Sequence, residues 1–264
     1  MYDERDTIET THRTAVKALY EGRKIVPVRK GFGCSALSDC SEHGRLELHT
    51  GNWAFVGRDY GRAKVAGHFA RVLFVAMDRG GYGGADEEDF PDTQASFRRS
   101  IELPRNPHMG GVALILKHLV DDRDPRVLSS QCALTNAVKC SQHTDSMNTG
   151  ATGTMISRCG SHLRAEIECL DPDIVITQGG HPTDTVLRSI AALRLIREFA
   201  GPSRGRASVS GTERLVVLAT PHPARQPGLK WTRGVLPQFL LDGIALARVE
   251  LASRLQHRAT KTSA

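Results

Sequence analysis

Four short runs of apolar and β-branched residues are spaced along the chain, and each ends near glycine, proline or polar residues. Such a run is typical of a buried strand that leaves a sheet. Between and around these runs, apolar residues recur at helical spacing. The predicted strands are residues 71–76, 133–138, 173–177 and 215–219, and the predicted helices are residues 7–20, 110–120, 158–170, 183–199 and 236–255.

Strands that alternate with helices predict a parallel α/β sheet with helices on both faces, in a single domain. We expect residues 71–256 to form this core, preceded by a helix and a cysteine-containing loop within residues 1–70. Residues 31–51 are rich in Gly, Ser and Cys and predict an irregular loop, whereas residues 201–211 predict a flexible polar connection. The tail, residues 257–264, is expected to be disordered.

The carboxyl ends of the predicted strands are the places where a ligand is expected. In open α/β sheets, ligands bind in the crevice beyond these ends. The rule selects four segments, which are residues 77–84, 136–140, 178–181 and 220–228.

Length and composition restrict the class of protein. The chain has 264 residues, enough to bury a full core, and no apolar run reaches the length of a membrane span. The first twenty residues are charged and polar and lack the apolar middle of a secretory signal. We therefore expect a cytoplasmic protein whose thiols stay reduced.

The formal charge of +6 is unevenly distributed. From Ala191 to the end, 12 Lys and Arg stand against 4 Asp and Glu, while residues 86–89 are all acidic. A basic C-terminal third suits a polyanion, and nucleic acid is the commonest one. The alternative is that these basic side chains only cover solvated helix faces.

Cysteines suggest a metal site. Two of the six share one loop, a third leaves a predicted strand, and a fourth opens a predicted helix, so that four thiolates can hold zinc or an iron–sulfur cluster. Zinc sites usually show tighter pairs, so the loose spacing favours a cluster. Cys132 and Cys169 lie on apolar faces and are expected to be buried, and the alternative is that all six are inert. The four candidate ligands are Cys34, Cys40, Cys140 and Cys159.

Two strand-end residues are candidates for catalysis. Asp78 follows a predicted strand and precedes glycines, so it can orient a water for attack; the alternative is a cap or turn aspartate. His222 is held between Pro221 and Pro223 at the end of the last predicted strand. A neutral imidazole there can donate a hydrogen bond to charge that develops on a leaving group. The alternative is a histidine in a surface turn.

Asn136 is a candidate for ligand recognition. Its amide offers a donor and an acceptor together, which suits the edge of a base, although a strand-end cap is the alternative. Residues 80–84 (GGYGG) are similar to a phosphate-cradling loop but lack the Walker lysine and the dinucleotide spacing. A nucleotide cofactor is therefore not expected.

Taken together, these segments resemble the uracil-DNA glycosylase superfamily, and most closely its iron–sulfur branch. The similarity extends roughly from residue 34 to residue 248. It implies a three-layer α/β sandwich around a four-stranded parallel sheet, a flipped base bound at the strand ends, and a glycosidic bond broken by water. The residues that carry it are 74–80 (FVAMDRG), 134–140 (LTNAVKC), Cys159 with the helix to Leu170, 171–176 with the glycines that follow, and His222-Pro223.

The resemblance implies a role for each matching residue. Met77 and Gly80 belong to the substrate-binding segment, and Asp78 within this segment positions water. Asn136 reads the base, and His222 stabilises the departing base anion. The four candidate cysteines hold a structural [4Fe–4S] cluster, with zinc as the alternative. Leu229 is a candidate wedge in the DNA. The candidate phosphate contacts are Arg79, Arg225, Lys230 and Arg233.

Departures from the family pattern affect the substrate. Ala76 stands where the first motif usually has glycine, and Arg79 stands where it has proline. His108 occupies the position of the aromatic ring that stacks on uracil, after an acidic insertion at residues 86–105. A changed stacking surface and a longer loop can enlarge the pocket. A bulkier modified pyrimidine, as in phage DNA with a role in antiviral defence, is therefore an alternative to uracil.

Three classes of function remain open at this point. The first is a monofunctional DNA glycosylase that leaves an abasic site in single- or double-stranded DNA, acting as a monomer. The second is a protein that binds uracil or abasic DNA without turnover, which Arg79 in place of proline suggests. The third is an unrelated zinc or redox α/β protein.

Overall fold

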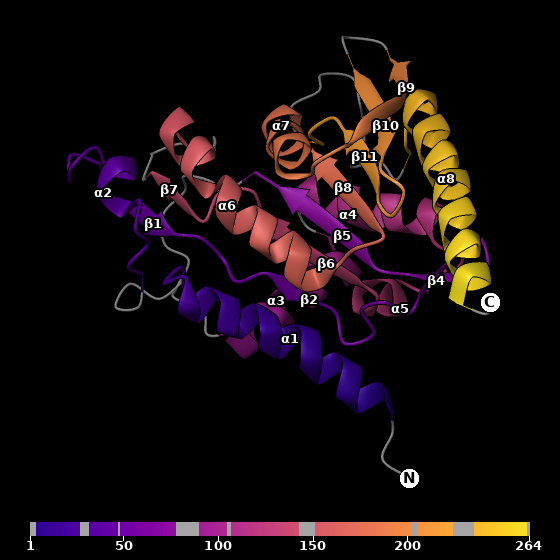
Figure 1. The fold of residues 1–264 in the computed structure, drawn as a ribbon, viewed down its shortest axis with the longest axis horizontal. Helices are drawn as coiled ribbons and strands as arrows, with labels where there is room; N and C mark the ends of the chain where they lie inside the picture. Colours follow the sequence, from indigo (N-terminus) through magenta and orange to yellow (C-terminus); the bar gives the residue numbers. More distant parts are fainter. Residues whose placement is uncertain are drawn as a thin grey trace.

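A seven-stranded sheet lies at the centre of the structure (Figure 1). The computed structural model describes residues 4–26, 32–46, 48–77, 90–104, 107–142, 151–201, 205–223 and 235–262. In sheet order, the strands are β2 (Phe55–Val56), β6 (Cys132–Asn136), β5 (Val72–Ala76), β8 (Ile174–Gln178), β11 (Val216–Thr220), β10 (Arg206–Gly211) and β9 (Arg194–Ala200).

The four strands expected from the sequence form the parallel centre of this sheet. β6, β5, β8 and β11 pair in parallel, with Ala76 opposite Asn136 and Thr220 opposite Gln178. The expectation of a purely four-stranded parallel sheet is wrong, because β2, β10 and β9 extend it on both sides in antiparallel pairing. The sheet is therefore mixed, with its parallel part in the middle.

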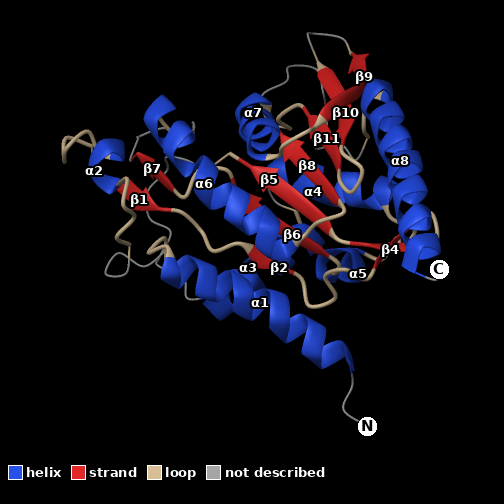
Figure 2. Ribbon diagram, viewed as in Figure 1, coloured by secondary structure: helices blue, strands red, loops and turns tan. Residues whose placement is uncertain are grey.

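Helices cover both faces, which gives three layers (Figure 2). Successive strand residues point to opposite faces: Phe74 packs in one core with Val112 and Leu240, and Val75 packs in the other with Leu163. The first face carries α3 (Phe90–Glu102), α4 (Pro107–Leu119), α5 (Pro125–Ser130) and α8 (Gln238–Thr262), and the second carries α1 (Glu4–Gly22), α6 (Gly153–Leu170) and α7 (Gly180–Ser189).

The segment expected to be an irregular loop, residues 31–51, is partly regular. It contains the short helix α2 (Leu37–Cys40) and the strand β1 (Leu48–Thr50). β1 pairs antiparallel with β7 (Cys140–Gln142), and this register sets Thr50 opposite Cys140. The N-terminal cysteine segment is thereby attached beside the end of β6. A separate hairpin joins β3 (Ala63–Val65) to β4 (His68–Ala70).

Three sequence predictions in the C-terminal half are wrong. The helix expected over residues 183–199 ends at Ser189, and residues 194–200 form the edge strand β9, because they pair with β10. The connection expected over residues 201–211 contains β10, which buries Ala207 and Val209 in alternation. The tail continues α8 as far as Thr262.

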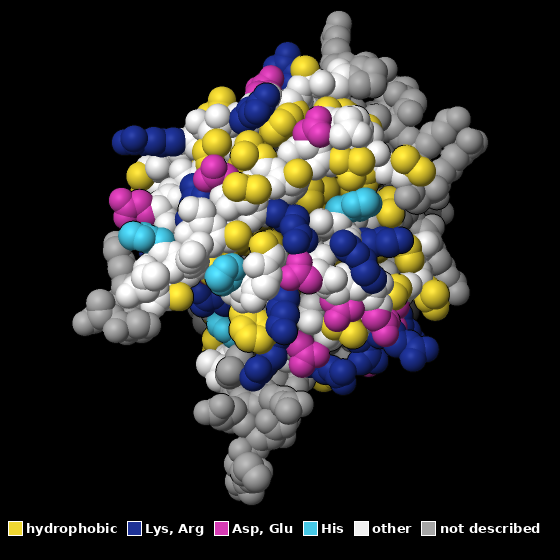
Figure 3. Space-filling view, turned by 90° about the vertical axis from the view of Figure 1, so that its right-hand side faces the viewer, with side chains coloured by type: hydrophobic (Ala, Val, Ile, Leu, Met, Phe, Trp, Pro, Cys, Tyr) yellow, Lys and Arg dark blue, Asp and Glu magenta, His cyan; other side chains and the backbone are white. Residues whose placement is uncertain are grey.

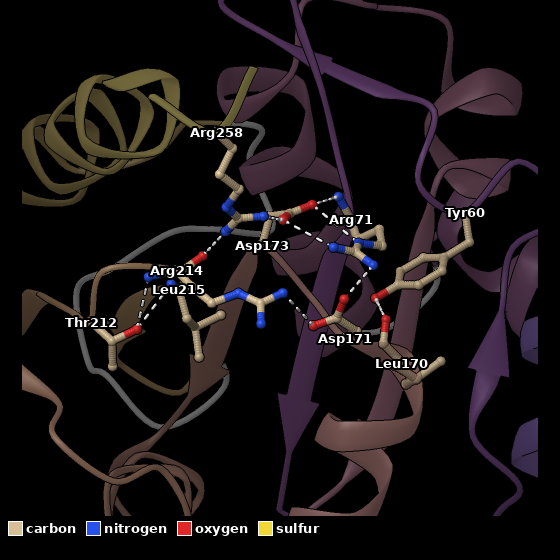
Figure 4. Close-up of polar contacts among 9 residues, drawn as sticks. All are labelled: Tyr60, Arg71, Leu170, Asp171, Asp173, Thr212, Arg214, Leu215 and Arg258. Carbon is tan, nitrogen blue, oxygen red and sulfur yellow. Dashed lines mark hydrogen bonds and ion pairs between the residues drawn. The ribbon is translucent and has the colours of Figure 1, made fainter. Parts of the chain in front are cut away.

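An ionic cluster closes the edge of the sheet at which the parallel strands begin (Figure 4). The carboxylate of Asp173, which is almost fully buried, accepts hydrogen bonds from the backbone N–H of Arg71 at 2.8 Å and from Arg258 at 2.6 Å. Arg71 also pairs with Asp171 at 2.6 Å. The cluster ties the end of α8 to the sheet, on the edge opposite the strand ends that carry the candidate site. Among the described helices, none has the length and apolar character needed to cross a membrane.

Candidate active site

Four predicted segments meet at one edge of the sheet. Asn136 ends β6, Met77 follows β5, Gln178 ends β8, and His222 lies two residues beyond β11. Because these strands are parallel neighbours in the order β6-β5-β8-β11, their carboxyl ends form one continuous row. Three strand intervals separate β6 from β11, which is about 14 Å. Asn136 and the segment that carries His222 thus lie at the two ends of this row.

Asn136 is fixed by the turn that follows it. Ala137 N–H donates to the carbonyl of Ala76 at 2.8 Å, and Val138 N–H donates to the carbonyl of Met77 at 2.9 Å. The exposed fraction of Asn136 is 7%, and its side-chain amide makes no hydrogen bond with any described residue. A nearly enclosed amide without a partner in the described part of the chain is available to a polar ligand.

His222 is held in place by close backbone contacts. Gly179 N–H donates to the carbonyl of Thr220 at 2.8 Å, and the Thr220 hydroxyl donates to the carbonyl of Thr177 at 2.8 Å. A Cβ added at Gly179, whose φ is +108°, would lie 3.4 Å from the Cβ of His222. A Cβ added at Gly111 would lie 2.6 Å from Cγ of Pro223. Glycine at both positions allows the histidine turn to pack between β8 and α4.

His108 and His222 face each other at this edge. Their ring centroids are 6.2 Å apart and their planes differ by 12°. Burial, and to a smaller extent the positive charge of a protonated His222, lower the pKa of His108 to about 4. His108 is therefore neutral at pH 7, and its Nδ1 is enclosed without a partner among the described residues.

Gln178 lies in the segment 178–181 that the sequence analysis selected, although its side chain was not named there as a candidate. Its side chain is fully buried, its Nε2 lies 3.5 Å from the carbonyl oxygen of His108, and its Oε1 has no partner in the described part of the chain. The sequence indications were its place in this strand-end segment and its polar side chain at the end of an otherwise apolar strand. Its position between the two histidine-bearing segments makes it part of the same edge.

Several candidates from the sequence lie outside the described residues. They include one catalytic candidate, one substrate-binding glycine and the residues expected to contact DNA. They are Asp78, Arg79, Gly80, Arg225, Leu229, Lys230 and Arg233.

The four candidate ligand cysteines come together. All of them line one small cavity, together with apolar side chains that include Phe32 and Leu37. As they stand, no three His, Cys, Asp or Glu side chains in the described ranges are at the spacing of a single-ion site. Cys132 is fully buried and Cys169 is half-buried, and neither lines this cavity. The cavity cysteines are Cys34 before α2, Cys40 at its end, Cys140 at the start of β7 and Cys159 in α6.

The thiols differ in how easily they ionise. The hydrogen bond from the Cys140 thiol lowers the pKa of Cys159 to about 7, against the opposing effect of burial, and Lys139 N–H also donates to its sulfur at 3.4 Å. The same hydrogen bond and burial raise the pKa of Cys140. Burial and the neighbouring thiols raise the pKa of Cys40 to about 11. Cys159 is thus the thiol that most readily supplies a thiolate.

One further polar group near the thiols, the imidazole of His162, was not predicted. His162 lies one helical turn after Cys159, and its Nε2 is 3.4 Å from the sulfur of Cys34. Burial lowers the pKa of His162 to about 4, helped by the positive charges of Lys139 and Arg23. Cys159 and His162 are three residues apart on one face of the helix. This spacing was the sequence feature that could have indicated that His162 lies near the thiols.

Several arginines of the basic C-terminal third pair with carboxylates. In α8, Arg248 pairs with Asp121 at 2.7 Å and Arg254 pairs with Glu250 at 2.5 Å. On the face of the molecule that includes α8, Lys and Arg side chains are interspersed with Asp and Glu (Figure 3). The uneven charge along the sequence therefore does not produce a uniformly basic surface on this face.

Comparison with known proteins identifies the family. The sequence profile of the uracil DNA glycosylase superfamily matches residues 64–228, more than half of the chain. The matched range includes Asn136, Cys140, Cys159 and His222. The comparison with curated proteins found no match. The profile covers β5, β6, β8 and β11 and the edge that they form, and the chain belongs to the uracil DNA glycosylase superfamily.

Proposed function

We propose that the protein is a monofunctional DNA glycosylase that hydrolyses the N-glycosidic bond of a flipped uracil or modified base and leaves an abasic site. One observation supports this most strongly. An amide without a partner among the described residues, Asn136, and the imidazole of His222 lie at the same edge of the sheet in a chain of this superfamily. Extrusion of the base from the DNA stack brings it within reach of both side chains.

On the base side, the two groups have separate roles. Asn136 offers one donor and one acceptor to the edge of the base. When the bond between C1′ and the base nitrogen breaks, the electron pair leaves with the base. His222 then donates a hydrogen bond to the base anion. A well-placed donor of this kind stabilises a transition state by roughly 3–4 kcal/mol.

On the sugar side, the proposal assigns the water to Asp78. This residue directly follows Met77, whose carbonyl accepts a hydrogen bond from the turn after Asn136. A carboxylate there stabilises the positive charge that develops on the sugar and accepts a proton from the water that adds to C1′. The water oxygen forms the new bond to C1′ and keeps one proton as the sugar hydroxyl, while its other proton goes to the carboxylate and, in the end, to the base anion.

His108 favours a modified base over plain uracil within this proposal. Its ring lies nearly parallel to that of His222, and it is neutral at pH 7. An imidazole is smaller than the phenyl ring usual at this position and carries a polar Nδ1 without a described partner. Both differences favour a bulkier, more polar pyrimidine, such as those in phage DNA. Excision of such a base from phage DNA gives the protein a role in defence.

For the metal, we propose that Cys34, Cys40, Cys140 and Cys159 hold an iron–sulfur cluster, with zinc as the alternative. The donor set supports this, because four thiols line one cavity and one of them has a pKa near 7. A bound cluster would supply structural cross-linking through four metal–thiolate bonds. These residues would connect the segment around α2 to β7 and α6, beside the turn that carries Asn136.

The DNA contacts in this proposal come from the loops around the site. Arg79, Arg225, Lys230 and Arg233 contact phosphates, and Leu229 occupies the space left by the flipped base. The partner is single- or double-stranded DNA with a modified base. The protein acts as a monomer in the cytoplasm, with a role in repair or defence.

A panel of substrates tests this function. Duplexes and single strands with uracil, 5-hydroxymethyluracil or a glycosylated pyrimidine are incubated with the protein, and abasic sites are then cleaved with alkali. We expect strand breaks at one or more modified bases, with His108→Phe shifting the preference towards uracil. Tight binding to the substrates without strand breaks at any of them would show that the protein binds modified DNA but does not cleave the glycosidic bond.

A further inference from the structure

A basic groove lies on the helical layer that contains α6 and α7, which lie side by side in Figure 1. Its volume is about 400 Å³, and it lies apart from the strand ends and the thiols. Three arginines line it: Arg23 just after α1, Arg164 in α6 and Arg188 in α7. Among the described residues of the lining, Glu168 is the single carboxylate, so that these residues carry a net charge of +2, three positive less one negative.

Two of the arginines are held by their Nε atoms, which leaves their outer nitrogens without a partner among the residues that the structure describes. Arg164 Nε donates to the carbonyl of Ser189 at 3.0 Å, and Arg188 Nε donates to the carbonyl of Asp184 at 3.1 Å. No described carboxylate lies within ion-pair distance of either one, or of Arg23. The Nη donors of Arg164 and Arg188, which suit bidentate contacts with an oxyanion, therefore have no partner among the described residues.

Hydroxyl groups add to this arrangement. Ser157, Ser161 and Arg164 follow one another at spacings of four and three residues on one face of α6, and Ser189 ends α7 opposite them. A Cβ added at Gly160 would meet no atom within 4 Å, so the floor of the groove is open at this point. Hydroxyls beside guanidinium groups are common contacts of phosphate oxygens.

A second groove of similar size provides a contrast. It is lined by Arg58 and Arg98, among others, and has a volume of about 380 Å³. There Arg58 pairs with Asp59 at 3.2 Å and Arg98 pairs with Glu102 at 3.9 Å. Two of the three arginines that line this groove, which also include Arg13, thus have carboxylate partners. The first groove is distinguished by the lack of described carboxylate partners.

We propose that the groove lined by Arg23, Arg164 and Arg188 binds phosphate groups, and that these belong to the backbone of the DNA strand beside the target nucleotide. The second part rests on the proposed glycosylase function. α7 begins at Gly180, directly after the strand-end residues Gln178 and Gly179. Arg188 lies eight residues along this helix, about 12 Å from its start. At about 3.4 Å per nucleotide, the groove is reached three or four nucleotides from the flipped base.

Binding of unmodified DNA tests the proposal independently of base release. The affinity for fluorescent single strands of increasing length is measured over a range of salt concentrations, with wild type, Arg164→Gln/Arg188→Gln and Arg58→Gln/Arg98→Gln. The last variant is the matched control, because it also removes two positive charges from a groove of similar size. Thermal unfolding of each variant verifies that it folds.

We expect the groove variant to bind long strands about tenfold more weakly than wild type. Its plot of log affinity against log salt should be less steep by about 1.4, because each lost phosphate contact on a single strand contributes about 0.7. For strands of two or three nucleotides, the difference should disappear. The control should differ from wild type by less than about twofold.

Equal losses in both variants, or no loss in the groove variant, would overturn the proposal. Titration with inorganic phosphate and with a nucleoside monophosphate distinguishes the sources of phosphate. In one outcome, these small ligands bind to wild type but not to the groove variant, while both proteins bind DNA equally well. This outcome would support a phosphate site in the groove and reject DNA as its ligand. If wild type binds DNA through the groove but excises no base, the proposed glycosylase function is wrong, whereas the proposal that the groove binds DNA phosphates is supported.

Discussion

The ammonium nitrogen of Lys139 lies 2.5 Å from Oε2 of Glu166, and both side chains are almost fully enclosed. The same nitrogen donates to the carbonyl of Asn136 at 2.5 Å and to the hydroxyl of Thr135 at 2.9 Å. All three ammonium hydrogens thus have acceptors. Lys139 also directly precedes Cys140. One buried ion pair therefore holds the turn between the candidate base-reading residue and the thiol cavity.

Lys139→Met is expected to lower the free energy of unfolding by about 3–5 kcal/mol, because it leaves the Glu166 carboxylate buried without a counter-charge. The double variant Lys139→Met/Glu166→Leu should recover most of this loss, since it removes both charges. Urea unfolding of the single and double variants measures the effect.

The exposed pair of Lys17 and Glu21, at 3.8 Å, provides the control, and Lys17→Met should change stability by less than about 0.5 kcal/mol. The losses of stability in Lys139→Met and Glu166→Leu are also added and compared with the loss in the double variant. If the double variant loses as much as this sum, the buried pair is not coupled in this way.

The sequence predicted the centre of the sheet because its strands are continuous apolar runs. Residues 173–177, Asp-Ile-Val-Ile-Thr, have the composition of a strand buried on both faces, and β8 occupies nearly the same range. β9 and β10 were missed for a physical reason. Their residues alternate apolar, charged and small side chains, and only pairing with each other and with β11 makes them strands.

For the candidate site, the sequence predicted residues that follow strands directly, such as Asn136 and His222. Their approach to one another follows from parallel strand order. Contacts between segments far apart in the chain could not be foreseen. Glu166 is 27 residues from Lys139, and the guanidinium groups of the groove come from three separate elements.

Replacement of a cavity cysteine tests the metal proposal. Cys140→Ser should lose bound iron and sulfide and the visible absorbance of a cluster, whereas Cys169→Ser, in the same helix as Cys159 but outside the cavity, should keep both. Metal and sulfide analysis of anaerobically purified protein measures this. A colourless wild type that contains zinc would instead support the alternative metal.

The stability of the protein should fall as the pH is lowered from about 6.5 to about 4. The pKa of His108 is about 4 in the folded protein, against 6.5 in its ordinary state, so the unfolded chain takes up a proton first. The contribution of this residue is complete above pH 6.5 and is lost towards pH 4. At 1.36 kcal/mol per pH unit over about 2.5 units, it amounts to between about 3 and 4 kcal/mol.

His108→Phe should accordingly make the free energy of unfolding less dependent on pH between 7.5 and 5. A weaker dependence will remain, because the pKa of His162 is lowered in the same direction. Chemical unfolding at a series of pH values measures both proteins. The same pH dependence in both would contradict a buried, neutral His108.

The ionic cluster at the opposite edge is expected to affect stability alone. Asp173→Asn leaves Arg71 and Arg258 without their buried carboxylate and should lower the free energy of unfolding by about 3 kcal/mol. Asp171→Asn, at a half-exposed carboxylate, should cost less than about 1 kcal/mol. Neither variant should change the rate of base release per folded molecule. A large loss of that rate in Asp173→Asn would place function at this edge too.

The most direct test of the central claim is the single-turnover rate of base release from the best substrate of the panel, measured for wild type, Asn136→Ala and His222→Ala. If the amide and the imidazole act on one flipped base, each variant should release it about 100-fold more slowly or worse than wild type, while still binding DNA. Release at the wild-type rate by both variants, or no release of any base by wild type, would contradict the proposal.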